Sequence, residues 1–226
     1  AVLLYSKIDD YEVSWKTRHN KRGSYRDYFN DYFDYVDVIF SPEQLEEVIV
    51  EIETKNGAPI NAFDSWLTSS LIKEKDKLSD LLGTKYIRQN KLAKAVEKFN
   101  KIDSMYWNNN YSLWNEEGHS LGSIFDQNPF YTLKYTPDFI QNKENFYLTK
   151  LSVAKKLIEY LELANNPAEE NRDLYYFLVA NCYKNMTFSG NSWMMRRFHV
   201  SNYDVEPYPE DELEFSKDLF SKKYYQ

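Results

Sequence analysis

The sequence predicts an all-α protein, a short array of antiparallel helical hairpins interrupted by an irregular, aromatic-rich insertion. From about Ser41 onward, apolar residues recur mostly at helical spacing. Only 6 glycines and 7 prolines occur among 226 residues, too few for the many turns of a β-sandwich. Hydrophobic residues make up 42% of the chain, enough for a sizeable core. We therefore expect one helical-repeat domain over residues 1–226.

The chain opens with a lead-in over 1–40, which the pattern leaves ambiguous. RDYFNDYFDYVDVIF favours an aromatic-rich helix, whereas AVLLYSKI suits an edge strand or an extended segment. The first clear helix follows directly. Ser41 is a typical N-cap, Pro42 fits the first helical position, and Gly57 ends the pattern.

The first helical block is expected over 41–103. After the helix that starts at Ser41, the stretch AFDSWLTSSLIKEKDKLSDLLGTKYIRQN predicts two short helices or one bent helix. A break at Asn90 separates it from KLAKAVEKFNKID, whose apolar residues share one face.

The middle of the chain, 104–141, carries most of the turn signals and is predicted to be an irregular insertion. Loops this long are often functional. Helical pattern resumes over 142–226, where KENFYLTKLSVAKKLIEYLELANN forms an apolar stripe. Pro167 fits the start of the next helix, and a last short helix is expected from about Asp211 to Lys223.

Gly83 lies inside a helical pattern, where glycine costs roughly 1 kcal/mol relative to alanine. Two antiparallel helices joined near Asn90 would bring Gly83 opposite Ala95 and let the two backbones approach closely. A weaker copy of the same spacing occurs in YYFLVANCYKNM. The residues predicted to pack the repeats are Leu82, Gly83, Tyr86, Ala95, Phe99, Val179, Ala180 and Tyr183.

This arrangement resembles the tetratricopeptide repeat, a 34-residue helix–turn–helix unit. The match covers about Asp76 to Lys101. Ser79 stands where the repeat has an early Trp, and Trp107 replaces its late Pro. The resemblance implies a solenoid whose concave face binds peptides or partner proteins.

Three further stretches are similar to the C-terminal parts of large, uncharacterised repeat proteins of Bacteroidetes cell envelopes, often lipoproteins. These are NPF at 128–130, the run LVANCYKNMTFSGNSWMM and the tail ELEFSKDLF. The resemblance implies a periplasmic or outer-membrane-associated location and a scaffold-like role, with a cytoplasmic location left open. Because the chain starts and stops abruptly, we expect it to be a piece of a longer protein.

Charge and motif content exclude several functions. The net charge of −7 argues against a general nucleic-acid binder, and no stretch is long and apolar enough for a transmembrane helix. Cys182, the only cysteine, permits no multi-cysteine metal site, and it lies in a helix of apolar pattern. The three histidines lie in separate segments, and no recognised catalytic or nucleotide-binding motif occurs. We predict no catalytic residue, metal or cofactor.

The function predicted first is a non-enzymatic protein-interaction or scaffolding domain with a protein or peptide partner. Aromatic and arginine side chains dominate binding hot spots. The candidate ligand-binding residues are Trp107, Tyr111, Trp114, Tyr131, Trp193 and Arg196. The same aromatics also suit the bland roles of capping the helical layers or packing back onto a helix.

Two alternatives stay open. Aromatics interleaved with Asn108, Asn109 and Asn110 suit stacking on sugar rings, which would make the chain a carbohydrate-binding helical protein at the cell surface. A helical glycan hydrolase is the least favoured, because nothing singles out a carboxylate pair from loop residues such as Glu116 and Asp126.

Overall fold

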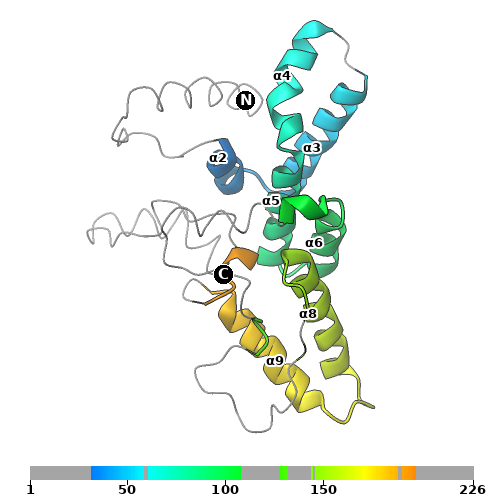
Figure 1. The fold of residues 1–226 in the computed structure, drawn as a ribbon, viewed down its shortest axis with the longest axis vertical. Coiled ribbons are helices and arrows are strands. Elements are labelled where there is room, and N and C mark those ends of the chain that lie inside the picture. The colour runs from blue at the N-terminus through cyan, green and yellow to red at the C-terminus, as the bar shows by residue number, and fades with distance from the viewer. Residues whose placement is uncertain are drawn as a thin grey trace, which may run out of the picture.

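The computed structural model describes residues 32–58, 61–107, 128–131, 144, 146–187 and 190–196. In these ranges every regular element is a helix, and none is a strand (Figure 1). The all-α prediction is therefore confirmed for the described part. Several predictions lie outside it: the edge strand near the N-terminus, the last short helix at 211–223, and the candidate residues Tyr111 and Trp114.

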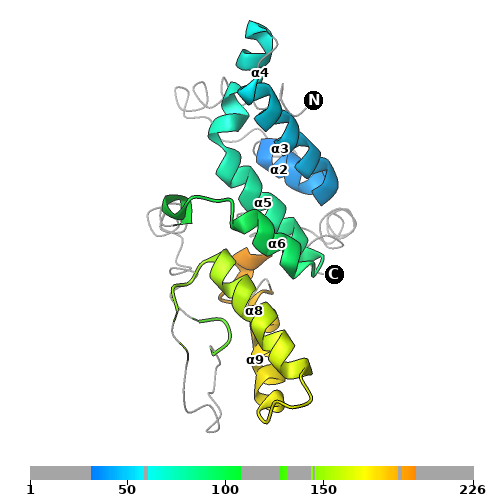
Figure 2. The ribbon, with the colours of Figure 1, turned by 90° about the vertical axis from the view of Figure 1, so that its right-hand side faces the viewer.

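The helices follow one another along the long axis of the molecule. The elements, in chain order, are α2 (Tyr32–Ile39), α3 (Pro42–Gly57), α4 (Ala62–Lys73), α5 (Lys75–Arg88), α6 (Leu92–Phe99), α8 (Lys150–Asn165), α9 (Arg172–Asn185) and the 3₁₀ turn η1 (Trp193–Met195). Helices α3 and α4 lie at one end, α5 and α6 in the middle, and α8 and α9 at the other end (Figures 1 and 2). Of the predicted insertion, 104–107 is helical and 128–131 forms a turn.

The helix boundaries follow the predicted capping chemistry in the first block. Ser41 caps α3 through a capping box with Gln44, and Pro42 occupies the first turn. At the predicted break, Asn90 has a φ of 56°, a conformation that asparagine tolerates better than most residues. The Lys91 amide then donates to the Tyr86 carbonyl and closes the end of α5.

The start of α9 corrects one prediction. The helix begins at Arg172, whereas Pro167 had suggested an earlier start. Asx-type side-chain contacts explain the delay, because the Asn166 carboxamide accepts from the Ala168 amide and the Glu169 carboxylate accepts from the Asn171 amide. Such contacts hold the backbone in turns and compete with helix formation.

Helix α5 is the centre of the first group of helices. It packs against α2, α3, α4 and α6, while α6 also packs on α8, and α8 on α9. Every α5 residue from Leu78 to Ile87 is buried as a result, polar ones included. This all-round burial forces the charged side chains of α5 to find partners inside the protein.

The predicted close approach at Gly83 exists. The atoms nearest to an added Cβ all belong to the Phe99 ring, with Cε1 at 2.2 Å, so Phe99 is the closest neighbour of Gly83. Leu82, Tyr86 and Ala95 are buried as well. The absent side chain of Gly83 makes room for a fully buried aromatic ring of α6.

The second predicted repeat pack is partly wrong. Val179 is buried and Tyr183 is half-buried, but Ala180 is exposed on α9. Spacing alone therefore misassigned Ala180, because no helix of the described part covers that side of α9. Within the described ranges, no helix is long and apolar enough to cross a membrane.

Candidate functional site

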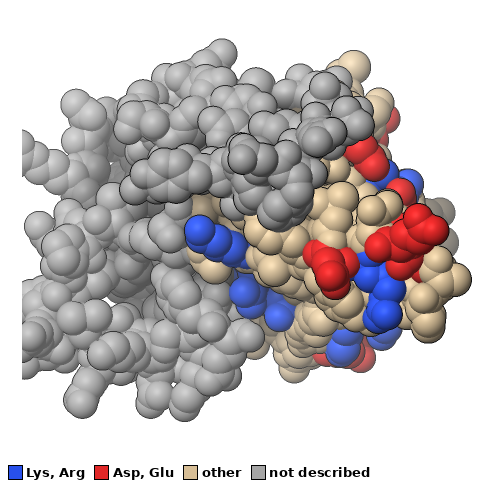
Figure 3. Space-filling view, turned by 90° about the horizontal axis from the view of Figure 1, so that it is seen from below, with Lys and Arg blue, Asp and Glu red and all other residues tan. Residues whose placement is uncertain are grey.

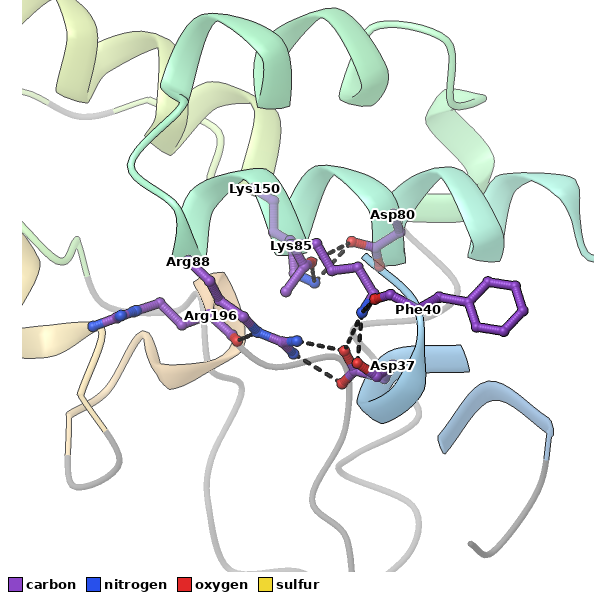
Figure 4. Close-up of polar contacts among 8 residues, drawn as sticks. Asp37, Phe40, Asp80, Lys85, Arg88, Lys150 and Arg196 are labelled. Atoms are coloured by element: carbon purple, nitrogen blue, oxygen red, sulfur yellow. Dashed lines mark hydrogen bonds and ion pairs between the residues drawn. The ribbon is translucent and has the colours of Figure 1, made fainter. Parts of the chain in front are cut away.

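The described part contains a buried cluster of charged side chains, which we call the ionic junction. It comprises Asp37 of α2, Asp80, Lys85 and Arg88 of α5, and Lys150 at the start of α8 (Figure 4). Each of these side chains is at least nine-tenths buried. The ionic junction therefore ties together three helices that are far apart in the sequence.

One half of the ionic junction centres on Lys150, which is completely buried. Its Nζ donates to Asp80 Oδ1 at 2.7 Å and to Thr84 Oγ1 at 2.8 Å. The Tyr106 hydroxyl donates to the other Asp80 oxygen at 3.0 Å. Burial lowers the pKa of Lys150 while Asp80 opposes this, and burial together with the Asp80 charge raises the pKa of Tyr106.

The other half holds the end of α2. Arg88 binds Asp37 through both terminal guanidinium nitrogens, Nη1 to Oδ1 and Nη2 to Oδ2, the latter at 2.9 Å. Lys85 Nζ donates to the backbone carbonyls of Asp37 and Phe40, which closes the C-terminus of α2. Arg88 Nε also donates to the carbonyl of Arg196, just after η1.

The ionic junction can hold helices in position relative to one another. Its charged groups are buried and turned toward one another (Figure 4). Within the described ranges, no group of three or more His, Cys, Asp or Glu is placed to hold a metal ion. Removing one partner of such a buried pair leaves the other charge buried without compensation, which destabilises a fold.

A second polar cluster joins α5 to α3 and α6. The Tyr86 hydroxyl donates to Glu46 Oε2 at 2.9 Å, and Lys98 pairs with the other Glu46 oxygen. Burial and the Glu46 hydrogen bond raise the pKa of Tyr86 to about 12. Burial opposes the charged form of Lys98, but its bonds to Glu46 and Glu97 outweigh this and raise the Lys98 pKa.

The candidate ligand-binding residues that the structure describes do not form a surface. Trp107, Tyr131 and Trp193 are all buried, with 5–6% of each residue exposed. Trp107 meets the Phe99 ring edge-on at 5.7 Å, and the Tyr131 hydroxyl lies 3.0 Å from that of Tyr160. This corrects their assignment as ligand-binding residues: these three aromatics belong to the core.

Arg196, the fourth candidate that the structure describes, also packs against the helices. It is half-buried, and burial together with the nearby Arg88 charge lowers its pKa. Its carbonyl accepts the Arg88 bond described above. The described residues around the candidates Trp193 and Arg196 thus form a folded turn that is hydrogen-bonded to Arg88 at the end of α5.

The NPF stretch is also a docked turn. The Asn181 carboxamide donates to the carbonyls of Phe130 at 2.8 Å and Pro129 at 3.3 Å, and Asn185 donates to Pro129 at 2.7 Å. The Phe130 ring is fully buried, edge-on to Tyr160 with centroids 5.0 Å apart. In Figure 1 this turn is the short green segment that lies beside α9.

The chain turns at Gly190–Asn191, and a close approach explains the glycine. An added Cβ at Gly190 would lie 2.1 Å from the Asn185 carbonyl oxygen. That oxygen also accepts from the Ser192 amide at 2.8 Å. The turn folds the chain back so that Trp193, Met194 and Met195 are buried.

The most exposed aromatic pair of the described helices is not among the predicted site residues. Phe63 and Trp66 on α4 are 60% and 51% exposed, with ring centroids 5.6 Å apart. The core face of α4 carries Leu71, which is fully buried. The missed signal is their spacing, because residues three apart on a helix are neighbours on its surface.

On the face of the described helices seen in Figure 3, acidic and basic side chains are interspersed, so neither sign of charge dominates that face.

Neither a protein-family model, nor a curated protein, nor a solved structure matches this chain.

Proposed function

We propose that this chain is a non-enzymatic protein-interaction or scaffolding domain built from stacked helical hairpins. The pairs α3–α4, α5–α6 and α8–α9 would be its successive units, in the manner of a tetratricopeptide-like solenoid. What supports this is that the helices of each pair pack on each other and that α6 packs on α8. Its proposed place in a bacterial cell envelope rests on the sequence resemblance alone.

The exposed Phe63–Trp66 pair is the observation that carries the proposal. Both side chains are more than half exposed, and a contiguous exposed apolar patch often marks an interaction site. Tryptophan is among the residues most enriched in binding hot spots. Both rings sit on a regular helix and contact each other, so little conformational entropy would be lost on binding.

The alternatives gain less from the geometry. A sugar-binding platform needs coplanar exposed rings, but Phe63 and Trp66 are tilted by 35°, and Trp107 and Tyr131 are buried. The carboxylates considered for a hydrolase, Glu116 and Asp126 among them, lie outside the described residues.

Site-specific photo-crosslinking tests the proposal. The photo-reactive analogue p-benzoylphenylalanine would replace Phe63 in the full chain, and Met105 in a control, because Met105 is equally exposed away from α4. We expect a discrete protein adduct from position 63 and not from position 105. The purified adduct partner should then bind Phe63→Ser/Trp66→Ser at least about tenfold more weakly than wild type, with Met105→Ser unchanged.

Three outcomes would contradict the proposal: identical adducts from both positions, equal affinity of the Phe63→Ser/Trp66→Ser variant, or a glycan in place of a protein in the adduct. The last outcome would favour the carbohydrate-binding alternative. Circular dichroism of each variant confirms that a lost interaction is not lost folding.

A further inference from the structure

The place where the chain holds residues 128–131 has the chemistry of a peptide-binding site. We call it the turn site and define it by Tyr160 of α8 with Asn181 and Asn185 of α9. The turn lies 51 residues before Asn181 in the sequence, so the contact joins distant segments. It is also separate from the Phe63–Trp66 surface, which lies on α4.

The turn site binds the backbone of residues 128–131 through hydrogen bonds. Asn181 and Asn185 donate three hydrogen bonds to only two carbonyls, those of Pro129 and Phe130. Both carboxamides are at least nine-tenths buried. Backbone carbonyls are present in any peptide, so side-chain amides directed at them are a general means of holding a short segment.

The turn site also contacts side chains of the turn. The Phe130 ring packs against Tyr160, and the Tyr131 hydroxyl meets the Tyr160 hydroxyl. Within the occupant, the Asn128 carboxamide oxygen accepts from the Phe130 amide at 3.0 Å and pre-forms the turn. Phe130 and Tyr131 therefore contact the turn site through their side chains, Pro129 contributes its carbonyl, and Asn128 stabilises the turn itself.

We propose that the turn site is a peptide-recognition site for an Asn-Pro-Phe-Tyr segment, that residues 128–131 occupy it in cis, and that a partner protein exposing the same sequence binds there when the internal turn is displaced. The occupied state is the one the structure shows. This inference does not depend on the function proposed for the Phe63–Trp66 surface.

Tethering explains why the internal turn takes precedence. A segment attached to the same chain competes with a free peptide at an effective concentration on the order of millimolar for short linkers. A free peptide must exceed this advantage before it binds. Weakening the internal turn, without touching the turn site, should therefore uncover binding in trans.

The experiment uses the full chain and a fluorescently labelled peptide of residues 126–133, DQNPFYTL. The Phe130→Ala variant removes the anchoring ring of the internal turn and leaves Tyr160, Asn181 and Asn185 intact. By fluorescence anisotropy we expect this variant to bind the peptide at least about tenfold more tightly than wild type. Adding Asn181→Ala to the variant should abolish that gain, and a peptide with alanine in place of its phenylalanine should not bind.

The test still distinguishes the outcomes if the Phe130→Ala variant is partly unfolded. If the variant is destabilised, the peptide should restore its helical circular dichroism or raise its melting temperature, because the phenylalanine supplied in trans refills the same place. The proposal is overturned if millimolar peptide neither binds nor stabilises the variant. Equal binding to the variant and to wild type would also overturn it, since the internal turn would then not be the competitor.

Discussion

The helix pairs α5–α6 and α8–α9 carry the same sequence spacing but use it differently. In α5, Leu82, Gly83 and Tyr86 are all buried, and Gly83 lies directly under the Phe99 ring of α6. In α9, Val179 is buried but Ala180, at the position equivalent to Gly83, is exposed. Equal spacing in the sequence thus produces a close helix contact in one pair and not in the other.

The α8–α9 half makes its close approach elsewhere. Gly190 comes against the backbone of Asn185 where the chain turns back after α9. The same helix uses Asn181 and Asn185 to hold the turn at 128–131. The first pair therefore makes its close approach where a glycine of α5 meets an aromatic ring of α6, whereas in the second half α9 holds two neighbouring backbone segments, at 128–131 and at Gly190.

Leucine at the two equivalent positions should give the largest difference between the two helix pairs. Gly83→Leu should destabilise the fold by about 4 kcal/mol, because the new side chain would occupy the space of the Phe99 ring and force α5 and α6 apart. Ala180→Leu should change stability by less than about 0.5 kcal/mol, since position 180 faces solvent. Urea unfolding followed by circular dichroism measures both values.

A result in which both leucine variants unfold at the same urea concentration would show that the two pairs do not differ in packing. Phe99→Ala offers a second check. If the ring is what excludes a side chain at position 83, Gly83→Ala should be far better tolerated in the Phe99→Ala background than in wild type.

The ionic junction links the two regions, and its largest predicted effect comes from Lys150. Lys150→Met should cost about 3 kcal/mol, because it leaves the Asp80 carboxylate buried without the cation that it binds. The double variant Lys150→Met/Asp80→Asn should recover a large part of that loss. If the single variant were as stable as wild type in urea, the buried pair would have no role in holding α8 against α5.

How far the sequence predicts this structure depends on which interactions decide each feature. Local chemistry placed α3 correctly from Ser41 to Gly57, because capping residues act within one turn of the chain. Helical periodicity identified the apolar core of α5 and α6 for the same reason. The sequence predicts a close helix contact at Gly83. That the Phe99 ring is the nearest neighbour depends on how α6 is rotated about its own axis, which the spacing does not specify.

The candidate site was predicted less well, for physical reasons. Trp107, Tyr131 and Trp193 lie in segments rich in turn signals, and only long-range packing determines that they are buried. The ionic junction joins residues 37 and 150, which no local pattern relates. The exposure of Phe63 and Trp66 is equally a property of what packs on α4 and what does not.

Glycine-to-alanine changes test the close approach of Gly190 to the Asn185 backbone. Gly190→Ala should destabilise the protein by about 2 kcal/mol, because the added Cβ would overlap the Asn185 carbonyl and the backbone must move. Gly57→Ala is the matched control, since nothing lies within 4 Å of the corresponding Cβ at the end of α3. We expect Gly57→Ala to be neutral or slightly stabilising in thermal unfolding. Equal melting temperatures for the two variants would contradict the close approach at Gly190.

The smallest effects concern one tyrosine hydroxyl in each pair. Tyr86→Phe removes a hydrogen bond to Glu46 and should cost about 1 kcal/mol at neutral pH, whereas Tyr183→Phe removes an exposed bond to Asn90 and should cost about half as much. The pH dependence separates Tyr86 further, because burial and Glu46 raise its pKa to about 12. A pKa raised in the folded state favours the neutral hydroxyl. Its stabilisation is therefore fully present below the unfolded pKa of about 10 and is lost as the pH rises through about 12. Urea unfolding across that range should show wild type losing stability more steeply than Tyr86→Phe, and parallel pH profiles would mean that this hydroxyl is not held by Glu46.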